Sequence, residues 1–82
     1  MNNIRVLFFA TLRDRVGLRL AELQVPAQTT VTGFKSILME KFPALQGLTS
    51  HILISVNQEY AFDEANIPDG AEIALFPPVS GG

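Results

Sequence analysis

The sequence predicts an α+β domain in which a single helix covers one face of one β-sheet. Four segments place apolar residues at every second position, which is the period of a strand, and one segment between them follows the helical period. Their order along the chain is strand, strand, helix, strand, strand. A chain of 82 residues suffices for one domain, and its 48% apolar residues indicate a globular one.

The first two predicted strands precede the helix. Residues 4–10 are apolar on both faces, which is typical of an interior strand. Residues 13–17 are mostly polar and predict only a connection. Residues 21–25 alternate between apolar and polar side chains and are followed by Pro26, which predicts a half-buried outer strand that ends there.

The helix is predicted over residues 31–42. Thr30 is a suitable N-cap, because its hydroxyl can accept a hydrogen bond from a free backbone N–H. Pro43 ends the helix at the preceding residue or earlier. Gly33 lies in the first turns and costs about 1 kcal/mol of helix stability relative to alanine. The apolar face of this helix consists of Val31, Phe34, Leu38 and Phe42.

The last two strands are predicted over residues 52–56 and 71–76. Asn57-Gln58 predicts a turn after the first of them, and Pro68-Asp69-Gly70 predicts a turn before the second. Pro77-Pro78 ends the last strand, because proline has no N–H to donate to a neighbouring strand.

Composition excludes several classes of function. Without cysteine, the chain has no disulfide, no thiolate nucleophile and no side-chain thiol that could carry sulfur. Six basic and eight acidic residues give a net charge of −2, and no run of lysine or arginine suggests nucleic-acid binding. The first residues do not form a signal peptide, and no apolar run approaches the ~20 residues of a membrane span. We therefore expect a cytoplasmic protein.

The residues after Phe76 form a distinctive tail, Pro77-Pro78-Val79-Ser80-Gly81-Gly82. Two prolines favour an extended path, and two glycines without side chains follow them. Six extended residues reach roughly 20 Å, which is enough to enter a narrow slot in another protein. The alternative is a frayed terminus without a role. These features divide the chain into a domain of residues 1–76 and a tail of residues 77–82.

The sequence FPPVSGG of residues 76–82 resembles the terminal signature of the small-subunit family of molybdopterin synthases. The resemblance extends over essentially the whole chain, and it implies the β-grasp fold of ubiquitin. Gly33 within the helix and residues 63–66 depart from the family pattern, but neither lies in the tail. The other segments that agree in order and spacing are residues 6–10, Leu12-Arg13, Val16-Gly17, Thr30-Val31, Val56-Asn57-Gln58 and Asp69-Gly70.

This resemblance implies a sulfur carrier whose working group is the carboxylate of Gly82. A partner adenylyltransferase would consume ATP to adenylate it, and a sulfur donor enzyme would convert it to a thiocarboxylate. The synthase large subunit would then use this sulfur to build the dithiolene of molybdopterin from cyclic pyranopterin monophosphate. No cofactor would be bound permanently. Gly81 would allow the tail to fit a narrow channel of the partner. The residues expected to bind the partner are Phe76, Pro77, Pro78, Val79 and Ser80.

For the other candidate residues, a place on the surface or in the core is favoured over a role in a functional site. His51, Arg13 and Arg15 are most simply read as solvated surface groups, although an arginine can contact a partner or a nucleotide. Asp63-Glu64 has no further ligand-type neighbours, so a solvated loop is favoured over a metal site. Phe8 and Phe9 are expected in the core. Phe76 lies where strand becomes tail, so docking and core roles are equally plausible.

Three alternative functions stay open at this point. The sulfur carrier of thiazole synthesis also ends in Gly-Gly, although Pro77-Pro78 and the chain length favour the molybdopterin branch. A protein modifier would instead join Gly82 to lysines of target proteins. A plain β-grasp interaction domain would have an inert tail. A stand-alone enzyme is disfavoured, because no convergent set of polar groups is evident.

Overall fold

The computed structural model describes residues 1–48 and 51–77 of the chain. It contains five strands, two α-helices and one 3₁₀ turn. In chain order they are β1 (Asn2–Phe8), α1 (Ala10–Val16), β2 (Leu20–Val25), α2 (Val31–Lys41), η1 (Pro43–Leu45), β3 (Leu53–Val56), β4 (Glu59–Tyr60) and β5 (Glu72–Phe76).

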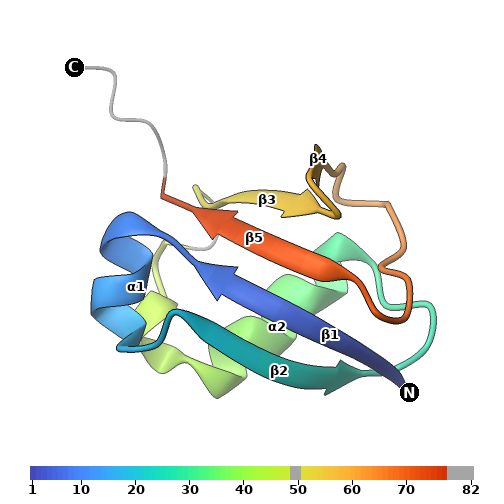
Figure 1. Cartoon of the computed structure of the whole chain (residues 1–82), viewed down its shortest axis with the longest axis horizontal. Coiled ribbons are helices and arrows are strands. Elements are labelled where there is room, and N and C mark those ends of the chain that lie inside the picture. Colours follow the sequence, from blue (N-terminus) through green and yellow to red (C-terminus); the bar gives the residue numbers. More distant parts are fainter. Residues whose placement is uncertain (49–50, 78–82) are drawn as a thin grey trace.

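The five strands form one mixed sheet in the order β2-β1-β5-β3-β4. β1 and β5 are parallel neighbours although they come from opposite ends of the chain, and the other neighbouring pairs are antiparallel. α2 crosses one face of this sheet (Figure 1). Antiparallel hairpins on either side of a parallel central pair, with a helix laid across them, constitute the β-grasp fold. The predicted α+β class is therefore confirmed.

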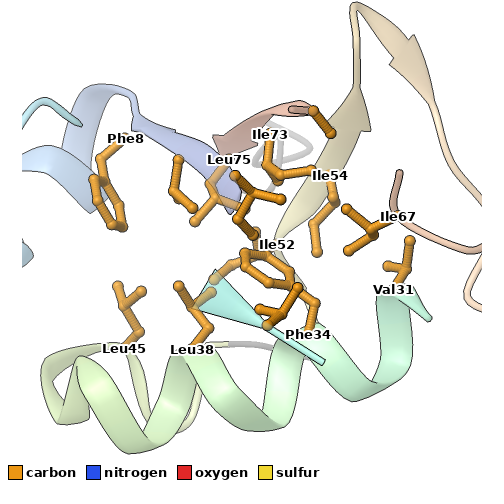
Figure 2. Packing of buried hydrophobic residues seen from close by; sticks show 14 of the residues in the cluster. Phe8, Val31, Phe34, Leu38, Leu45, Ile52, Ile54, Ile67, Ile73 and Leu75 are labelled. Carbon is orange, nitrogen blue, oxygen red and sulfur yellow. The ribbon is translucent and has the colours of Figure 1, made fainter. Parts of the chain in front are cut away.

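The core lies between α2 and the sheet (Figure 2). Val31, Phe34 and Leu38 of α2 are all buried and point toward the strands. Alternation along β1 and β5 turns every second side chain toward the helix, and the aromatic ring of Phe8 meets the edge of Phe42 at 5.1 Å. The strand residues on this inner face include Ile4, Val6, Phe8, Ile54, Ile73 and Leu75.

The start of α2 is held as the sequence predicts. The Thr30 hydroxyl accepts a hydrogen bond from the Gly33 N–H at 3.1 Å. A second contact ties this helix to the loop before β5, because Lys35 Nζ lies 3.1 Å from Asp63 Oδ1. The helix ends at Lys41, two residues before Pro43.

Helix α1 is not among the predicted elements, since the sequence predicts a strand up to residue 10 and a polar connection over residues 13–17. β1 stops at Phe8, and Ala10 adopts a φ of 52° that turns the chain into the helix. Gly17 ends it in a left-handed conformation, and its N–H donates to the Arg13 carbonyl at 2.8 Å. Burial of Leu12 stabilises this helix, because its side chain is fully buried against the core.

The other differences are small. Asn57-Gln58 forms the predicted turn, with φ values of 53° and 71°, but the chain then returns as the two-residue strand β4. The sequence predicts a sheet of four strands, which is wrong, because the structure has a fifth, short strand at the edge. A strand of two residues is too short to show a sequence period. Within the described ranges, no helix has the length and apolarity needed to cross a membrane.

Candidate functional site

The tail begins at the end of β5, the middle strand of the sheet. Phe76 pairs with Leu53 of β3, and on the other side the Phe9 N–H donates to the Leu75 carbonyl at 3.2 Å. The chain therefore leaves the sheet between β1 and β3, at the edge where α1 also begins (Figure 1). Pro77, the first predicted tail residue, is half-buried. The other predicted site residues, Pro78, Val79, Ser80, Gly81 and Gly82, lie outside the described residues.

The sheet face opposite α2 carries apolar side chains around this point. The strand register places Leu7 beside Leu20 and Ala74, and it places Ser55 beside Ala74 and Tyr60. One continuous row therefore crosses all five strands. A second row contains Phe9, Phe76 and Leu53. We call these residues together the outer patch: Leu7, Phe9, Leu20, Leu53, Tyr60, Ala74 and Phe76.

An aromatic stack forms the part of the outer patch nearest the tail. The rings of Phe9 and Phe76 lie 4.8 Å apart and nearly parallel, at an interplanar angle of 11°. Phe8 is buried as predicted, but the core prediction for Phe9 is wrong, since 40% of its surface is exposed. Successive strand residues point to opposite faces, so Phe9 lies away from the core when Phe8 lies in it. Phe76 is half-buried and belongs to the same outer face.

This face combines a hollow with exposed apolar side chains. A shallow hollow of about 340 Å³ lies over it, lined mainly by members of the outer patch together with Ser55, Gln58 and Glu72. Tyr60 is 76% exposed, and Leu53 is 38% exposed. Exposed apolar groups that adjoin one another are typical of interaction surfaces, whereas isolated ones are unremarkable. These residues form a largely apolar surface at the base of the tail.

The remaining candidates stay dispersed. His51, Arg13 and Arg15 are all exposed. Asp63 pairs with Lys35, and in the part of the chain that the structure covers no three potential metal ligands come together. Sequence reasoning missed Phe9, Leu53 and Tyr60 as members of one surface. The signal that joins them is cross-strand register, which local periodicity does not contain.

Comparison with known proteins gives the family of this chain. The model of the ThiS family matches residues 6–82. The chain is 37% identical to the molybdopterin synthase sulfur carrier subunit of Caenorhabditis briggsae, with 100% of both chains covered. It is 35% identical to the protein of the same name from Arabidopsis thaliana, over 96% of this chain and 82% of that one.

A solved structure shows the same fold at similar identity. Small archaeal modifier protein 1 of Haloferax volcanii superimposes with a TM-score of 0.86 and is 32% identical, covering 99% of this chain and 100% of that one. The resemblance to the small subunits of molybdopterin synthases is confirmed by the names of the relatives. Since both the family model and full-length relatives match from the first strand to the tail, this chain belongs to the ThiS family.

Proposed function

We propose that this protein is the sulfur carrier subunit of a molybdopterin synthase and that it carries sulfur as a thiocarboxylate on Gly82. The observation that carries the proposal is its 37% identity, over the full length of both chains, to a relative of that name. The absence of cysteine supports it, because no side-chain thiol competes for the role. The outer patch at the base of the tail supports a carrier that works by docking.

The chemistry proposed for Gly82 needs activation by a partner. A terminal carboxylate has a pKa of about 3.3–3.7, so at neutral pH it is ionised and unreactive toward nucleophiles. An adenylyltransferase would join it to the α-phosphate of ATP with release of pyrophosphate. A sulfur donor would then attack the acyl carbon and release AMP. The thiocarboxylate formed is a better nucleophile than the original carboxylate. ATP is in this scheme a substrate of the partner, and the carrier keeps no cofactor.

Docking of the domain would direct the tail. The Phe9–Phe76 stack adjoins the strand end from which the tail departs, so a partner that covers this stack is aligned with the tail. Pro77 and Pro78 stiffen the path, and Gly81 and Gly82 make its tip narrow. We propose that the synthase large subunit binds the outer patch and receives the tip in its active site. The adenylyltransferase would use the same geometry at the activation step.

A direct test is to convert the protein with an adenylyltransferase, ATP and a sulfide source. Replacing one oxygen by sulfur adds about 16 Da to the intact mass. Oxidation of Met1 or Met39 adds nearly the same mass, so the change must be assigned to a C-terminal fragment without methionine. A thiol-selective reagent gives a second readout, because the unmodified chain has no cysteine to react with it.

Deletion of Gly82 is the matched control for this test. We expect the deletion to abolish the trapped product and to leave the melting temperature nearly unchanged, because a terminal residue adds little to the core. Absence of product from the wild-type chain, with active partner enzyme and sulfide present, would contradict the proposed function.

A protein modifier is the second candidate, and the observation that favours it is the 32% identity to small archaeal modifier protein 1. Activation would be the same, but Gly82 would end in an isopeptide bond to a lysine. Mass spectrometry of cellular proteins distinguishes the two, because conjugates release lysines that bear the C-terminal residues of this chain. The carrier proposal predicts that molybdopterin synthesis is lost with Gly82 whether or not such conjugates form.

A further inference from the structure

A second hollow adjoins the outer patch on the side of β1 and α1. It measures about 520 Å³ and shares Leu7, Phe9 and Leu20 with the patch. Its other lining residues are Phe8, Arg13 and Arg19. A hollow lined by apolar residues and two arginines differs chemically from the hollow over β3 and β5, whose lining includes Glu72 and no arginine.

The fold brings the two arginines to this hollow from different elements. Arg13 lies on α1, and Arg19 lies in the turn that enters β2. Both segments are fixed by backbone hydrogen bonds: the Phe8 N–H donates to the Arg19 carbonyl at 3.0 Å, and the Gly17 N–H donates to the Arg13 carbonyl at 2.8 Å. Their convergence is therefore a consequence of the α1 turn and not of a flexible loop.

Among the residues that the structure describes, neither Arg13 nor Arg19 forms an ion pair with an acidic side chain. The ion pairs between side chains of residues 1–48 and 51–77 are Arg5 with Glu72 at 3.9 Å and Lys35 with Asp63 at 3.1 Å. No aspartate or glutamate lines the hollow. Two like charges facing one space favour an anion between them, and the planar guanidinium fork is well matched to a carboxylate.

We propose that this hollow receives an aspartate or glutamate side chain of the protein that docks on the outer patch. A protein carboxylate is favoured over a free phosphate because most of the lining is apolar and continuous with the patch. A partner surface that places an acidic residue beside apolar ones fits both parts at once. The proposal rests on the proposed function for the identity of that partner, the synthase large subunit.

The charge distribution also gives the docking a single direction. Arg13 and Arg19 lie at the tail end of the outer face, whereas at the opposite end of β5 Arg5 lies 3.9 Å from Glu72 and offsets its charge. A partner with its acidic group correctly placed is attracted only when the tail points toward its active site. Charges at the rim of an interface act mainly on the association rate and on its dependence on salt.

Charge reversal tests this inference directly. Arg19→Glu and Arg13→Glu should each lower the association rate with the large subunit by roughly 10–100-fold at low salt and weaken its salt dependence. Lys41→Glu is the matched control, because it makes the same change at an exposed position of α2, which covers the other face of the sheet, and Lys41 does not line this hollow. We expect the control to stay within about threefold of the wild type. Unchanged melting temperatures would show that all three variants fold.

The outcomes separate this inference from the proposed function. If the wild-type chain binds the large subunit and Arg19→Glu and Arg13→Glu bind at the rate and salt dependence of Lys41→Glu, the acidic contact is wrong and the carrier function stands. If the wild-type chain does not bind the large subunit, both proposals fail. Saturable binding of AMP or inorganic phosphate to the free chain below 1 mM, lost in Arg19→Glu, would replace the carboxylate with a phosphate ligand.

Discussion

At the scale of single residues, the consequential observation is that Phe8 and Phe9 lie on opposite faces of the sheet. Phe8 fills the core, and Phe9 stacks on Phe76 at the base of the tail. One position along the chain thus separates a core residue from one that lies on the outer face, where we propose that a partner docks. The two arginines beside Phe9 extend this surface with charge.

Truncation of Phe76 should separate binding from folding. Phe76→Ala removes the stack with Phe9, which is worth about 0.5–1.5 kcal/mol beyond the buried area. We expect a folded variant whose melting temperature falls by a few degrees and whose affinity for the large subunit falls at least about tenfold. Calorimetry and a binding titration on the same samples provide the two numbers.

Phe62→Ala is the control for this prediction. Phe62 is 81% exposed and lies outside the outer patch, so its loss should change stability by less than about 0.5 kcal/mol and leave affinity unaltered. Equal losses of affinity in the two variants would mean that the docking surface lies elsewhere.

The turn between β3 and β4 allows a second prediction at this scale. Asn57 and Gln58 both adopt positive φ values, which the tight hairpin turn requires and which Gln58 adopts at a steric cost. Gln58→Gly should raise the free energy of unfolding by up to about 1 kcal/mol. The same change at Gln46, where φ is −60°, should lower it because glycine only adds freedom to the unfolded chain. Denaturant unfolding measures both, and a loss of stability in Gln58→Gly would contradict the strain argument.

At the scale of elements, the two helices show how glycine position decides stability. Gly33 lies in α2 with a helical φ, and a Cβ built there would meet Thr29 and Thr30 atoms at 3.5 Å and 3.6 Å, which are ordinary contacts. Gly17 lies at the end of α1 with a φ of 83°, which side chains resist. The same residue type is therefore dispensable in one helix and required in the other.

Alanine at these positions should have opposite effects. Gly33→Ala should stabilise the protein by about 0.5–1 kcal/mol, because alanine is the better helix former and nothing obstructs its methyl group. Gly17→Ala should destabilise by about 1 kcal/mol, since it forces a left-handed alanine. The urea concentrations at the midpoint of unfolding, compared between each variant and the wild type, measure both changes in stability. A destabilising Gly33→Ala would indicate that the first turn of α2 cannot accommodate the methyl group.

At the scale of the whole molecule, the parallel pairing of β1 with β5 determines how the parts cooperate. It brings the start of the chain beside the strand that leads into the tail, so Phe9, α1 and both arginines gather where the tail departs. The docking and delivery that we propose would then both take place at one end of the domain. The opposite end holds the turns and the Arg5–Glu72 pair.

The proposed tail should tolerate no side chain near its tip. Gly81→Val should leave the melting temperature unchanged, because the residue follows the last strand, yet it should slow sulfur transfer strongly by widening the tail and restricting its backbone. Gly81→Ala should give an intermediate rate. Single-turnover transfer from pre-formed thiocarboxylate measures the effect without the activation step. Wild-type rates in Gly81→Val would show that the receiving channel is not narrow.

Much of the fold follows from the sequence alone. The spacing of apolar residues predicts the bounds of β1, β2, β3, β5 and α2 to within two residues. In each of these elements the apolar residues recur at the period of a strand or of a helix. The Thr30 cap and the Asn57-Gln58 turn are equally local and were predicted correctly. The FPPVSGG tail is also local, because it can be read as a run of consecutive residues. It resembles the terminal signature of the family, whose model matches residues 6–82.

Tertiary structure alone decides what local patterns do not contain. α1 forms because the core accepts Leu12, and Phe9 joins Phe76, Leu53 and Tyr60 because the strands align in one register. Arg13 and Arg19 line one hollow because the α1 turn brings their two segments together. Sequence period reports which side of its own strand a residue occupies. Which residues of other strands lie beside it depends on topology, which is set by the packing of the whole chain.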